Sequence, residues 1–400
     1  MIELVVSSVL LGALLGALYS GFLVNVRGRR YIIQMDSIIF LIGTVISSCA
    51  TSVIILMVGR VLVGFGIGVA SYIIPLYISE LSPARYRGGF VALNTIAVTG
   101  GIFISYLVGY LLSPMQSWNY MLGVGVIPAI FLWIGTHFLP ETPRWLVKQG
   151  KWAEAMKVLR SLRANEQEVQ TEMEEIQKNL KTSQTALKEL FHPKIRKVFF
   201  LGMILATIQQ VTGINVILYY APLIFKAFGF ESDSSSFLLT LVVGFTNFLM
   251  TIITVFKVDK IGRRALLLYG LAGMTLSLVV LSVSLHYDLQ SLYTKGLIVF
   301  ALFSFVSCYA CSIGCVFWIV ISEIYPLNIR GVGMGFASAM NWFSNLCITI
   351  TFLSLVNVIG MSNTFLCYAM SGFFSFLYCY YFLPETAQVS LETIEARNYE

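Results

Sequence analysis

Eleven apolar runs dominate the chain, and each is about as long as a helix that crosses a bilayer. A helix needs about 20 predominantly apolar residues to span the hydrocarbon core. Backbone polar groups in lipid must be satisfied within the segment, so runs of this kind fold as transmembrane helices. An all-α membrane protein is therefore expected. The predicted spans are Leu4–Val24, Ile32–Ala50, Ile54–Ile78, Gly89–Leu112, Met121–Leu139, Val198–Phe225, Phe237–Phe256, Ala265–His286, Thr294–Ile321, Met334–Ile359 and Phe365–Leu383.

The basic residues have a strongly one-sided distribution. All but three of the 26 Lys and Arg residues lie in alternate connections or in the carboxyl-terminal tail; the exceptions are Lys226, Lys295 and Arg60. The positive-inside rule places that set of connections in the cytoplasm. We therefore expect a multi-pass protein of the plasma (inner) membrane whose C-terminus is cytoplasmic. The net charge of +6 reflects this topology, so we expect no binding to nucleic acid.

Three pieces of sequence occur twice, with offsets of 234, 243 and 244 residues. Each copy follows a predicted span on the cytoplasmic side. Such a pattern indicates a parallel duplication of a six-helix unit. The repeated pieces are Gly28-Arg29-Arg30 with Gly262-Arg263-Arg264, Ser79-Glu80 and Arg87-Gly88 with Ser322-Glu323 and Arg330-Gly331, and residues 139–142 with 383–386.

The two copies contain different numbers of helices. The segment Gln209–Tyr220 precedes the second Gly-Arg-Arg by about 50 residues, and its counterpart would lie before Met1. We therefore expect the first helix of the first copy to be absent, through a start-site error, a truncated gene or a natively short protein. The expected domains are a five-helix bundle at 1–149, a cytoplasmic helical linker at 150–193 and a six-helix bundle at 194–400.

The seven cysteines all lie in apolar stretches, and Cys308, Cys311 and Cys315 share one helical face. A metal site there is the less favoured interpretation, because buried cysteine behaves as a small hydrophobe. No nucleotide motif is visible either. We expect no cofactor and no enzymatic activity.

Three carboxamides, Gln209, Gln210 and Asn215, lie near the middle of one apolar run. Uncharged donors and acceptors suit the hydroxyls of a neutral sugar, whereas the alternative is that they join helices to one another. In a straight helix Gln210 and Asn215 lie about 140° apart. They face one cavity only if the helix breaks, and Gly213 is the predicted break.

Further motifs follow along nearly the whole chain, and together they resemble the sugar-porter family of the major facilitator superfamily. That family includes bacterial sugar–proton symporters and glucose facilitators. The motifs are Gly59-Arg60, Gly64–Gly68, Pro75–Glu80, Arg87-Gly88, Pro140–Trp145, Gln209–Asn215 with Tyr219-Tyr220, Asp259–Arg264, and Trp318 with Ser322-Glu323.

The resemblance implies a fold of two six-helix bundles, here with eleven helices, and transport of a monosaccharide by alternating access. Transport would be proton symport or facilitated diffusion, by a monomer whose partners are a small neutral sugar and the bilayer. Thr95 stands where the family usually has Gln. The implied sugar contacts are Gln209, Gln210, Asn215, Asn247, Trp318, Asn341, Thr95 and Gly314.

The resemblance also implies gating residues. Tyr219 and Tyr220 would form an extracellular gate, and Arg60 would pair with a proton-carrying Asp of the first family helix. Asp36 is expected to reach the cytoplasmic edge, so the printed chain is predicted not to couple uptake to protons. A salt-bridge network between the halves would hold the outward-facing state. Its pairs would be Glu80 with Arg87, Glu141 with Arg144, Asp259 with Arg263, and Glu323 with Arg330.

Two rival functions remain open on sequence grounds. One is a membrane sugar sensor that binds without translocating. The other is a truncated, non-functional transporter, since the first bundle would lack a helix that lines the cavity.

Overall fold

The computed structural model describes residues 1–83, 87–115, 117–182, 193–230, 232–287, 289, 291–325 and 330–385. These residues form helices and no strands. Eleven candidate spans occur among them, with mean hydropathies from 1.3 to 2.4. The predicted all-α membrane fold is therefore confirmed.

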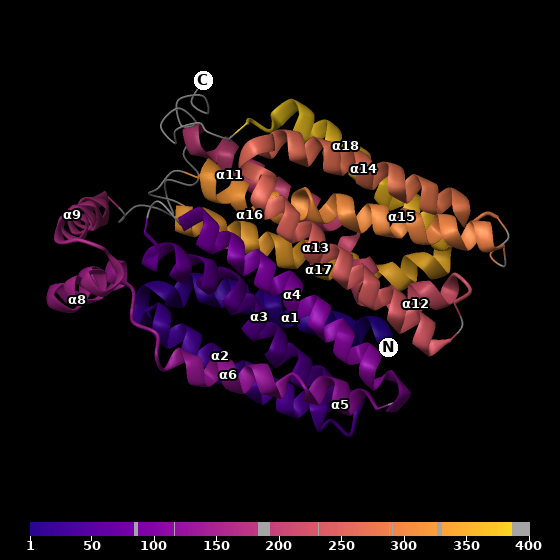
Figure 1. Cartoon of the computed structure of the whole chain (residues 1–400), viewed down its shortest axis with the longest axis horizontal. Coiled ribbons are helices and arrows are strands. Elements are labelled where there is room, and N and C mark those ends of the chain that lie inside the picture. Colours follow the sequence, from indigo (N-terminus) through magenta and orange to yellow (C-terminus); the bar gives the residue numbers. More distant parts are fainter. Residues whose placement is uncertain are drawn as a thin grey trace.

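The helices form two groups, which Figure 1 shows one above the other. We call the end of the molecule that carries α8 and α9 the linker end, and the opposite end the far end. The first group holds α1 (Ile2–Arg27), α2 (Arg29–Ser48), α3 (Val53–Leu81), α4 (Arg87–Leu112), α5 (Trp118–Gly123) and α6 (Val126–Thr136). In the sequence, the two groups are connected by α7 (Pro143–Lys148), α8 (Trp152–Leu162) and α9 (Glu166–Thr182). The second group holds α11 (Pro193–Val211), α12 (Ile214–Ala227), α13 (Asp233–Ile261), α14 (Arg263–Ser284), α15 (Leu292–Ala310), α16 (Ile313–Ile324), α17 (Arg330–Ile359) and α18 (Met361–Phe382).

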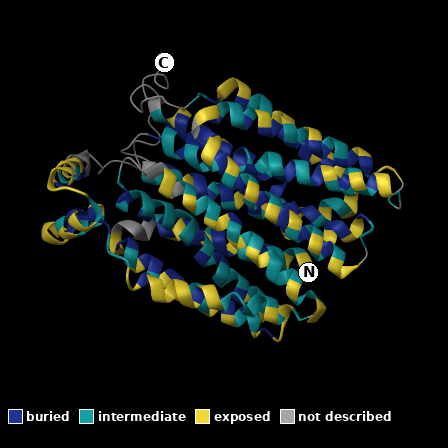
Figure 2. Cartoon of the chain, in the orientation of Figure 1, coloured by how far each residue is buried: buried dark blue, intermediate teal, exposed yellow. Residues whose placement is uncertain are grey.

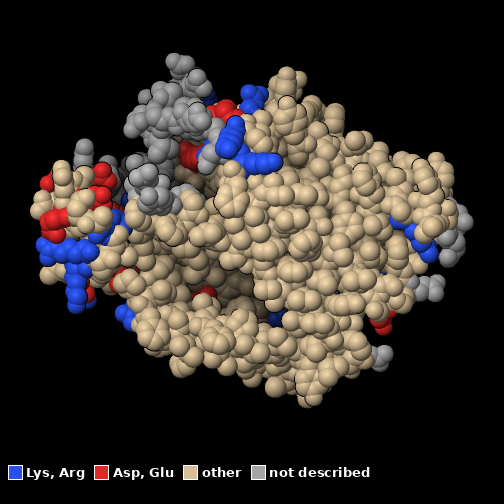
Figure 3. Space-filling model, viewed as in Figure 1, with Lys and Arg blue, Asp and Glu red and all other residues tan. Residues whose placement is uncertain are grey.

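The surface separates into an apolar belt and charged ends. Figure 3 shows almost no charged atoms along the helices, whereas Lys, Arg, Asp and Glu gather at α8, α9 and the two ends. Figure 2 shows exposed residues along the outward faces of the helices and buried residues between them. Exposed side chains in the belt include large hydrophobic ones such as Phe131 and Phe373. A bilayer is the solvent that suits such a surface.

Close helix packing in the first group depends on small residues. A Cβ on Gly64 of α3 would overlap the carbonyl oxygen of Val9, and one on Gly12 of α1 would overlap that of Val61. Small residues allow membrane helices to approach this closely. As a result, α3 packs tightly between α1 and α2.

Three of the predicted spans are interrupted. The break at Thr212-Gly213 was predicted, but those at Val124-Gly125 and Cys311-Ser312 were not. At the third break Ser312 leaves the helical region with φ −129° and ψ −108°. Its hydroxyl donates to the carbonyl of Cys308 (2.6 Å), so this acceptor, which the break frees, still has a partner.

The repeated sequence pieces build the same arrangement twice at the linker end. The Glu141 carboxylate accepts hydrogen bonds from the backbone N–H groups of Arg29 (3.0 Å) and Arg30 (3.2 Å) at the start of α2. Glu385 does the same for Arg263 (3.0 Å) and Arg264 (3.1 Å) at the start of α14. A carboxylate at a helix N-terminus satisfies free donors and complements the helix dipole.

The described ion pairs at the repeated turns were not predicted. Arg29 pairs with Glu80 (2.7 Å) and Arg263 pairs with Glu323 (3.0 Å), each within its own group of helices. The duplicated Gly-Arg-Arg turn brings Arg29 to the Glu80 carboxylate, whereas the side chain of Arg87, its predicted partner, lies outside the described residues.

The other predicted pairs have different outcomes. Glu141 caps α2, as described above, and no described contact joins it to the exposed Arg144. The side chains of Arg87, Asp259 and Arg330 lie outside the described residues.

The two groups meet along α1 with α17 and along α4 with α13. At the far end, Glu3 accepts hydrogen bonds from the N–H (2.8 Å) and hydroxyl (2.9 Å) of Ser354. Farther along the interface, Trp342 Nε1 donates to Ser71 Oγ (3.1 Å). Toward the linker end, the Tyr72 hydroxyl donates to the carbonyl of Gly331 (3.2 Å). Contacts between the groups thus occur at both ends.

Candidate functional site

The amide cluster lies where the span of α11 and α12 is broken. Gly213 adopts a left-handed conformation (φ 83°), which ends α11 and starts α12. The hydroxyl of Ser371, on α18, donates to the freed carbonyl of Val211 (2.7 Å), and Thr212 Oγ1 donates to that of Gln209 (3.2 Å). The break therefore has its own hydrogen-bond partners.

A continuous chain of hydrogen bonds joins the amides. Asn215 Nδ2 donates to Gln210 Oε1 (2.6 Å), and Gln210 Nε2 donates to Asn341 Oδ1 (3.0 Å). Asn341 Nδ2 in turn donates to Gln209 Oε1 (2.5 Å) and to the carbonyl of Ala206 (3.2 Å). We call Gln209, Gln210, Asn215 and Asn341 the amide network. It brings together four of the predicted sugar contacts.

The amide network also connects two interrupted spans. Gln209 Nε2 donates to the carbonyl of Ile313 (3.2 Å), the first residue of α16 after the break at Ser312. Four helices, α11, α12, α16 and α17, are joined in this way. The amides thus join helices, which was the alternative role considered from the sequence. Each amide has two N–H groups and an oxygen with two lone pairs, so some donors and acceptors are still free to bind a ligand.

The remaining predicted sugar contacts form no described side-chain hydrogen bond with the amide network. Trp318 is half-buried and packs edge-on against Phe317, with ring centroids 4.9 Å apart. The Tyr309 ring lies close to Gly314, where a Cβ would come within 2.7 Å of it. Asn247 is buried on α13, and its Oδ1 has no hydrogen-bond partner among the described residues. Thr95 is half-buried on α4, in the first group.

Asn345 is a polar residue near the amide network that was not among the predicted sugar contacts. It lies one turn after Asn341 on α17, donates to the Tyr219 hydroxyl (3.2 Å) and accepts from Thr349 Oγ1 (3.1 Å). The i, i+4 spacing of two asparagines in an apolar helix was the available signal, because such residues share a face.

The two predicted gate tyrosines occupy different environments. Tyr219 is 39% exposed, whereas Tyr220 is only 1% exposed. The Tyr220 hydroxyl donates to the carbonyl of Thr349 (3.2 Å), and its ring lies 5.3 Å from that of Phe352. Of the two, only Tyr219 therefore has an exposed side chain, whereas Tyr220 is buried within the second group.

The two ionisable residues inside the first spans differ in their partners. Arg60, on α3, is half-buried and donates from Nε to the carbonyl of Val5 (2.9 Å) on α1. Asp36, on α2, is only 5% exposed, so the expectation that it reaches the membrane edge is wrong. The short Asp side chain cannot extend to water as Lys or Arg can.

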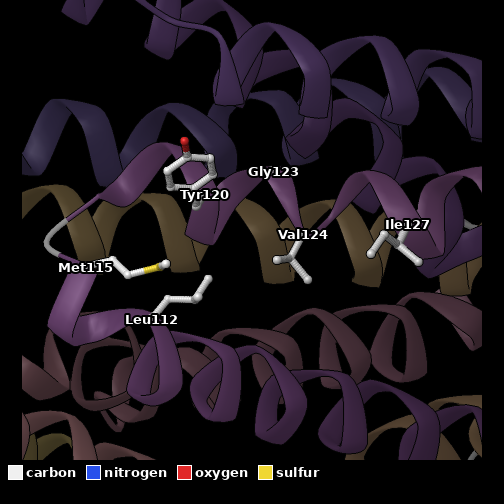
Figure 4. Close-up of a pocket in the computed structure, with 6 residues that line it drawn as sticks. All are labelled: Leu112, Met115, Tyr120, Gly123, Val124 and Ile127. Carbon is white, nitrogen blue, oxygen red and sulfur yellow. The ribbon is translucent and has the colours of Figure 1, made fainter.

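One large groove can be set aside as a sugar site. A cavity of about 420 Å³ lies along α4, α5 and α6 and is lined by Leu112, Met115, Tyr120, Gly123, Val124 and Ile127. In Figure 4 the Tyr120 hydroxyl points away from Leu112 and Met115. A sugar site needs several convergent polar groups, and this apolar groove offers none among its lining residues.

Comparison with known proteins gives matches along the whole chain. The family model described as "Sugar (and other) transporter" matches residues 1–397. The arabinose-proton symporter of Escherichia coli K12 is 40% identical over 99% of this chain and 84% of its own. The galactose-proton symporter of the same strain is 38% identical over 98% of this chain and 85% of its own.

Solved structures agree with these matches. The proton:xylose symporter XylE bound to 6-bromo-6-deoxy-D-glucose has a TM-score of 0.84 at 30% identity, covering 100% of this chain and 89% of that one. An inward open form of XylE from E. coli has a TM-score of 0.82 at 28% identity, covering 99% and 88%. With its fold, interrupted spans and family match taken together, this chain belongs to the sugar transporter family of the major facilitator superfamily.

Proposed function

We propose that this protein carries a monosaccharide across the membrane by alternating access. The observation that carries the proposal is the amide network, which forms where two interrupted spans meet inside the second group. Discontinuous helices at a substrate site are a recurring feature of transporters. The relatives named for galactose, arabinose and xylose support a small sugar as the substrate class.

Sugar hydroxyls would bind by forming new hydrogen bonds with the amide side chains or by replacing those within the amide network. Gln210 has one N–H without a described partner, and the half-buried Asn215 has an oxygen without one. A neutral polyol both donates and accepts, so it matches carboxamides and requires no charged partner. The half-buried ring of Trp318 would supply an apolar face for the C–H groups of the sugar.

Alternating access requires the two groups of helices to separate at one end at a time. The bonds of Glu3 with Ser354 would open at the far end, and that of Tyr72 with Gly331 would open at the linker end. We place the linker end in the cytoplasm, because nearly all basic residues lie in the connections on that side.

The test is counterflow of radiolabelled sugar in proteoliposomes, beside sugar binding to the purified protein. Galactose, arabinose and xylose are the sugars to begin with, given the relatives. We expect both binding and counterflow for at least one of them. Binding without counterflow would instead identify a sugar sensor. Absence of both binding and counterflow would overturn sugar recognition.

A further inference from the structure

Asp36 is a buried carboxylate that no step of the proposed transport uses. It follows the first residue of α2, Arg29, by seven positions, which corresponds to about 10 Å along the helix axis. Only 5% of the residue is exposed. An ionisable residue inside a membrane span is by default a candidate functional site.

Asp36 differs from Glu80, the other carboxylate described as buried in the first group, in having no described partner. No described residue forms a hydrogen bond or ion pair with Asp36, and its buried Oδ1 has no partner. Glu80 is equally buried at 5%, but it pairs with Arg29 at 2.7 Å. A buried carboxylate without a partner is costly in its charged form, and taking up a proton removes that cost.

A small cavity connects Asp36 with the linker end. It measures about 170 Å³ and lies between α1, α2 and α3. Arg27, the last residue of α1, and Tyr31, in the first turn of α2, stand at its linker end, where Arg27 lies 5.7 Å from the Tyr31 ring centroid. Tyr19 of α1 and the apolar Phe65 and Val69 of α3 also line it.

The groups around the cavity favour a proton over a metal cation. The titratable or charged residues that line the cavity with Asp36 are Tyr19 and Arg27 from α1 and Tyr31 from its own helix, while α3 contributes only apolar lining residues. A hard metal ion needs several oxygen ligands. The described residues contain no group of three acidic, His or Cys side chains, and Arg27 would repel a metal at the cavity.

We infer that Asp36 is a proton-binding site of the first group of helices, filled from the linker end through this cavity. The site adjoins α3 closely, because a Cβ on Gly66 would lie 3.2 Å from Asp36 Oδ1. Loss of the proton therefore places a charge against the backbone of the helix that carries Arg60. Proton binding stabilises the packing of α2 on α3 seen here, and its release favours a different arrangement. This coupling to movement rests on the proposed function, whereas the proton site itself does not.

The proton site is tested without transport by a hydrophobic carbodiimide, which modifies protonated carboxyls within membranes. The purified protein in nanodiscs is treated at a series of pH values, and modified peptides are identified by mass spectrometry. We expect modification of Asp36 that decreases as the pH rises, with Glu80 protected by its ion pair. Absence of modification at Asp36 at every pH, or equal modification of Glu80, would overturn the site.

Coupling is tested in proteoliposomes with an inward proton gradient. Asp36→Asn keeps the size of the side chain but cannot take up or release a proton, so we expect loss of proton-driven sugar accumulation with counterflow retained. Ser37→Ala is the matched control, because Ser37 is buried beside Asp36 and bonds only within its own helix. Accumulation that persists in Asp36→Asn, or is absent from the unmodified protein despite counterflow, overturns the coupling. Absence of counterflow from the unmodified protein instead counts against the proposed function.

Discussion

Gln210 stands between Asn215 and Asn341 in the amide network and is bonded to both. Gln210→Ala and Asn215→Ala each remove a donor and an acceptor from this chain. We expect each change to weaken sugar binding by about 1–3 kcal/mol, the usual penalty for a lost buried hydrogen bond. Isothermal titration calorimetry measures the affinity. Asn363→Ala is the control, because Asn363 is an exposed amide bonded only to the carbonyl of Ile359. Unchanged affinity in both network variants would contradict the prediction.

Trp318 offers an aromatic face on α16, one of the helices that the amide network joins. Trp318→Phe keeps part of that face, whereas Trp318→Ala removes it. We therefore expect Trp318→Ala to weaken pyranose binding more than Trp318→Phe does, as judged by competition with radiolabelled sugar. Equal losses in the two variants would show that stacking on this ring does not contribute.

Single residues differ in how far the sequence predicts their roles. The amides Gln209, Gln210 and Asn215 stand out because polar residues are rare in an apolar run, and the structure brings them together. The burial of Asp36 could not be predicted, because it depends on how α1 and α3 cover that face of α2. The same holds for the partner of Glu80, which is set by where the Gly-Arg-Arg turn places Arg29.

Among the helices, the break at Gly213 determines where the amides meet. Its φ of 83° is one that other residues rarely adopt, and a Cβ there would lie 2.9 Å from the Tyr368 ring. We expect Gly213→Ala to destabilise the protein by about 1–3 kcal/mol and to lower its Tm. Gly296→Ala is the control, because Gly296 lies within α15 and a Cβ there meets no atom within 4 Å. A Tm that falls equally in both variants would contradict the importance of the break.

The breaks also show what sequence patterns can reveal about an element. Gly213 was identified because the amides on either side need it. The break at Ser312 was missed, because Cys311 and Ser312 are compatible with a membrane helix and no polar cluster surrounds them. Its position depends instead on packing against α14, where a Cβ on Gly270 would overlap the Ser312 side chain.

Arg163 connects the linker helices α8 and α9 to the first group. Arg163 donates to both oxygens of Glu172 on α9 (2.6 and 2.9 Å) and to the carbonyl of Leu81 at the end of α3 (2.9 Å). We expect Arg163→Ala to release the linker and to accelerate its cleavage in limited proteolysis.

Arg160 provides the matched control in the same linker. It pairs with Glu166 (2.7 Å) at an exposed position, where its hydrogen bonds and charge hold the pKa of Glu166 below the ordinary value. Exposed pairs contribute little to stability, so Arg160→Ala is expected to leave the cleavage rate unchanged. Equal acceleration in both variants would show that Arg163 has no special part in attaching the linker.

At the scale of the whole molecule, the duplication allows each group of helices to serve as a reference for the other. In the second group, α11 packs against α17 and α18. The repeated sequence pieces relate α17 to α4, and α18 to the span of α5 and α6. The apolar groove of Figure 4 lies along α4, α5 and α6. In the most apolar part of each span, 6% of the residues of α4 are buried compared with 22% for α17. The corresponding shares are 11% for α5–α6 and 33% for α18.

This difference in packing predicts a difference in local stability. Segments with few buried contacts open more readily, so amide hydrogens of α5–α6 should exchange faster than those of α18 when the protein is held in nanodiscs. Gly123→Ala adds a methyl group to the groove wall, with its Cβ 3.7 Å from that of Ser48, and favours the helix. We expect it to slow exchange in α5–α6. Gly135→Ala also favours the helix but meets no atom within 4 Å, so it separates the effect of packing from that of helix propensity. Equal protection of α5–α6 and α18, or equal slowing by the two variants, would show that the groove does not weaken the first group.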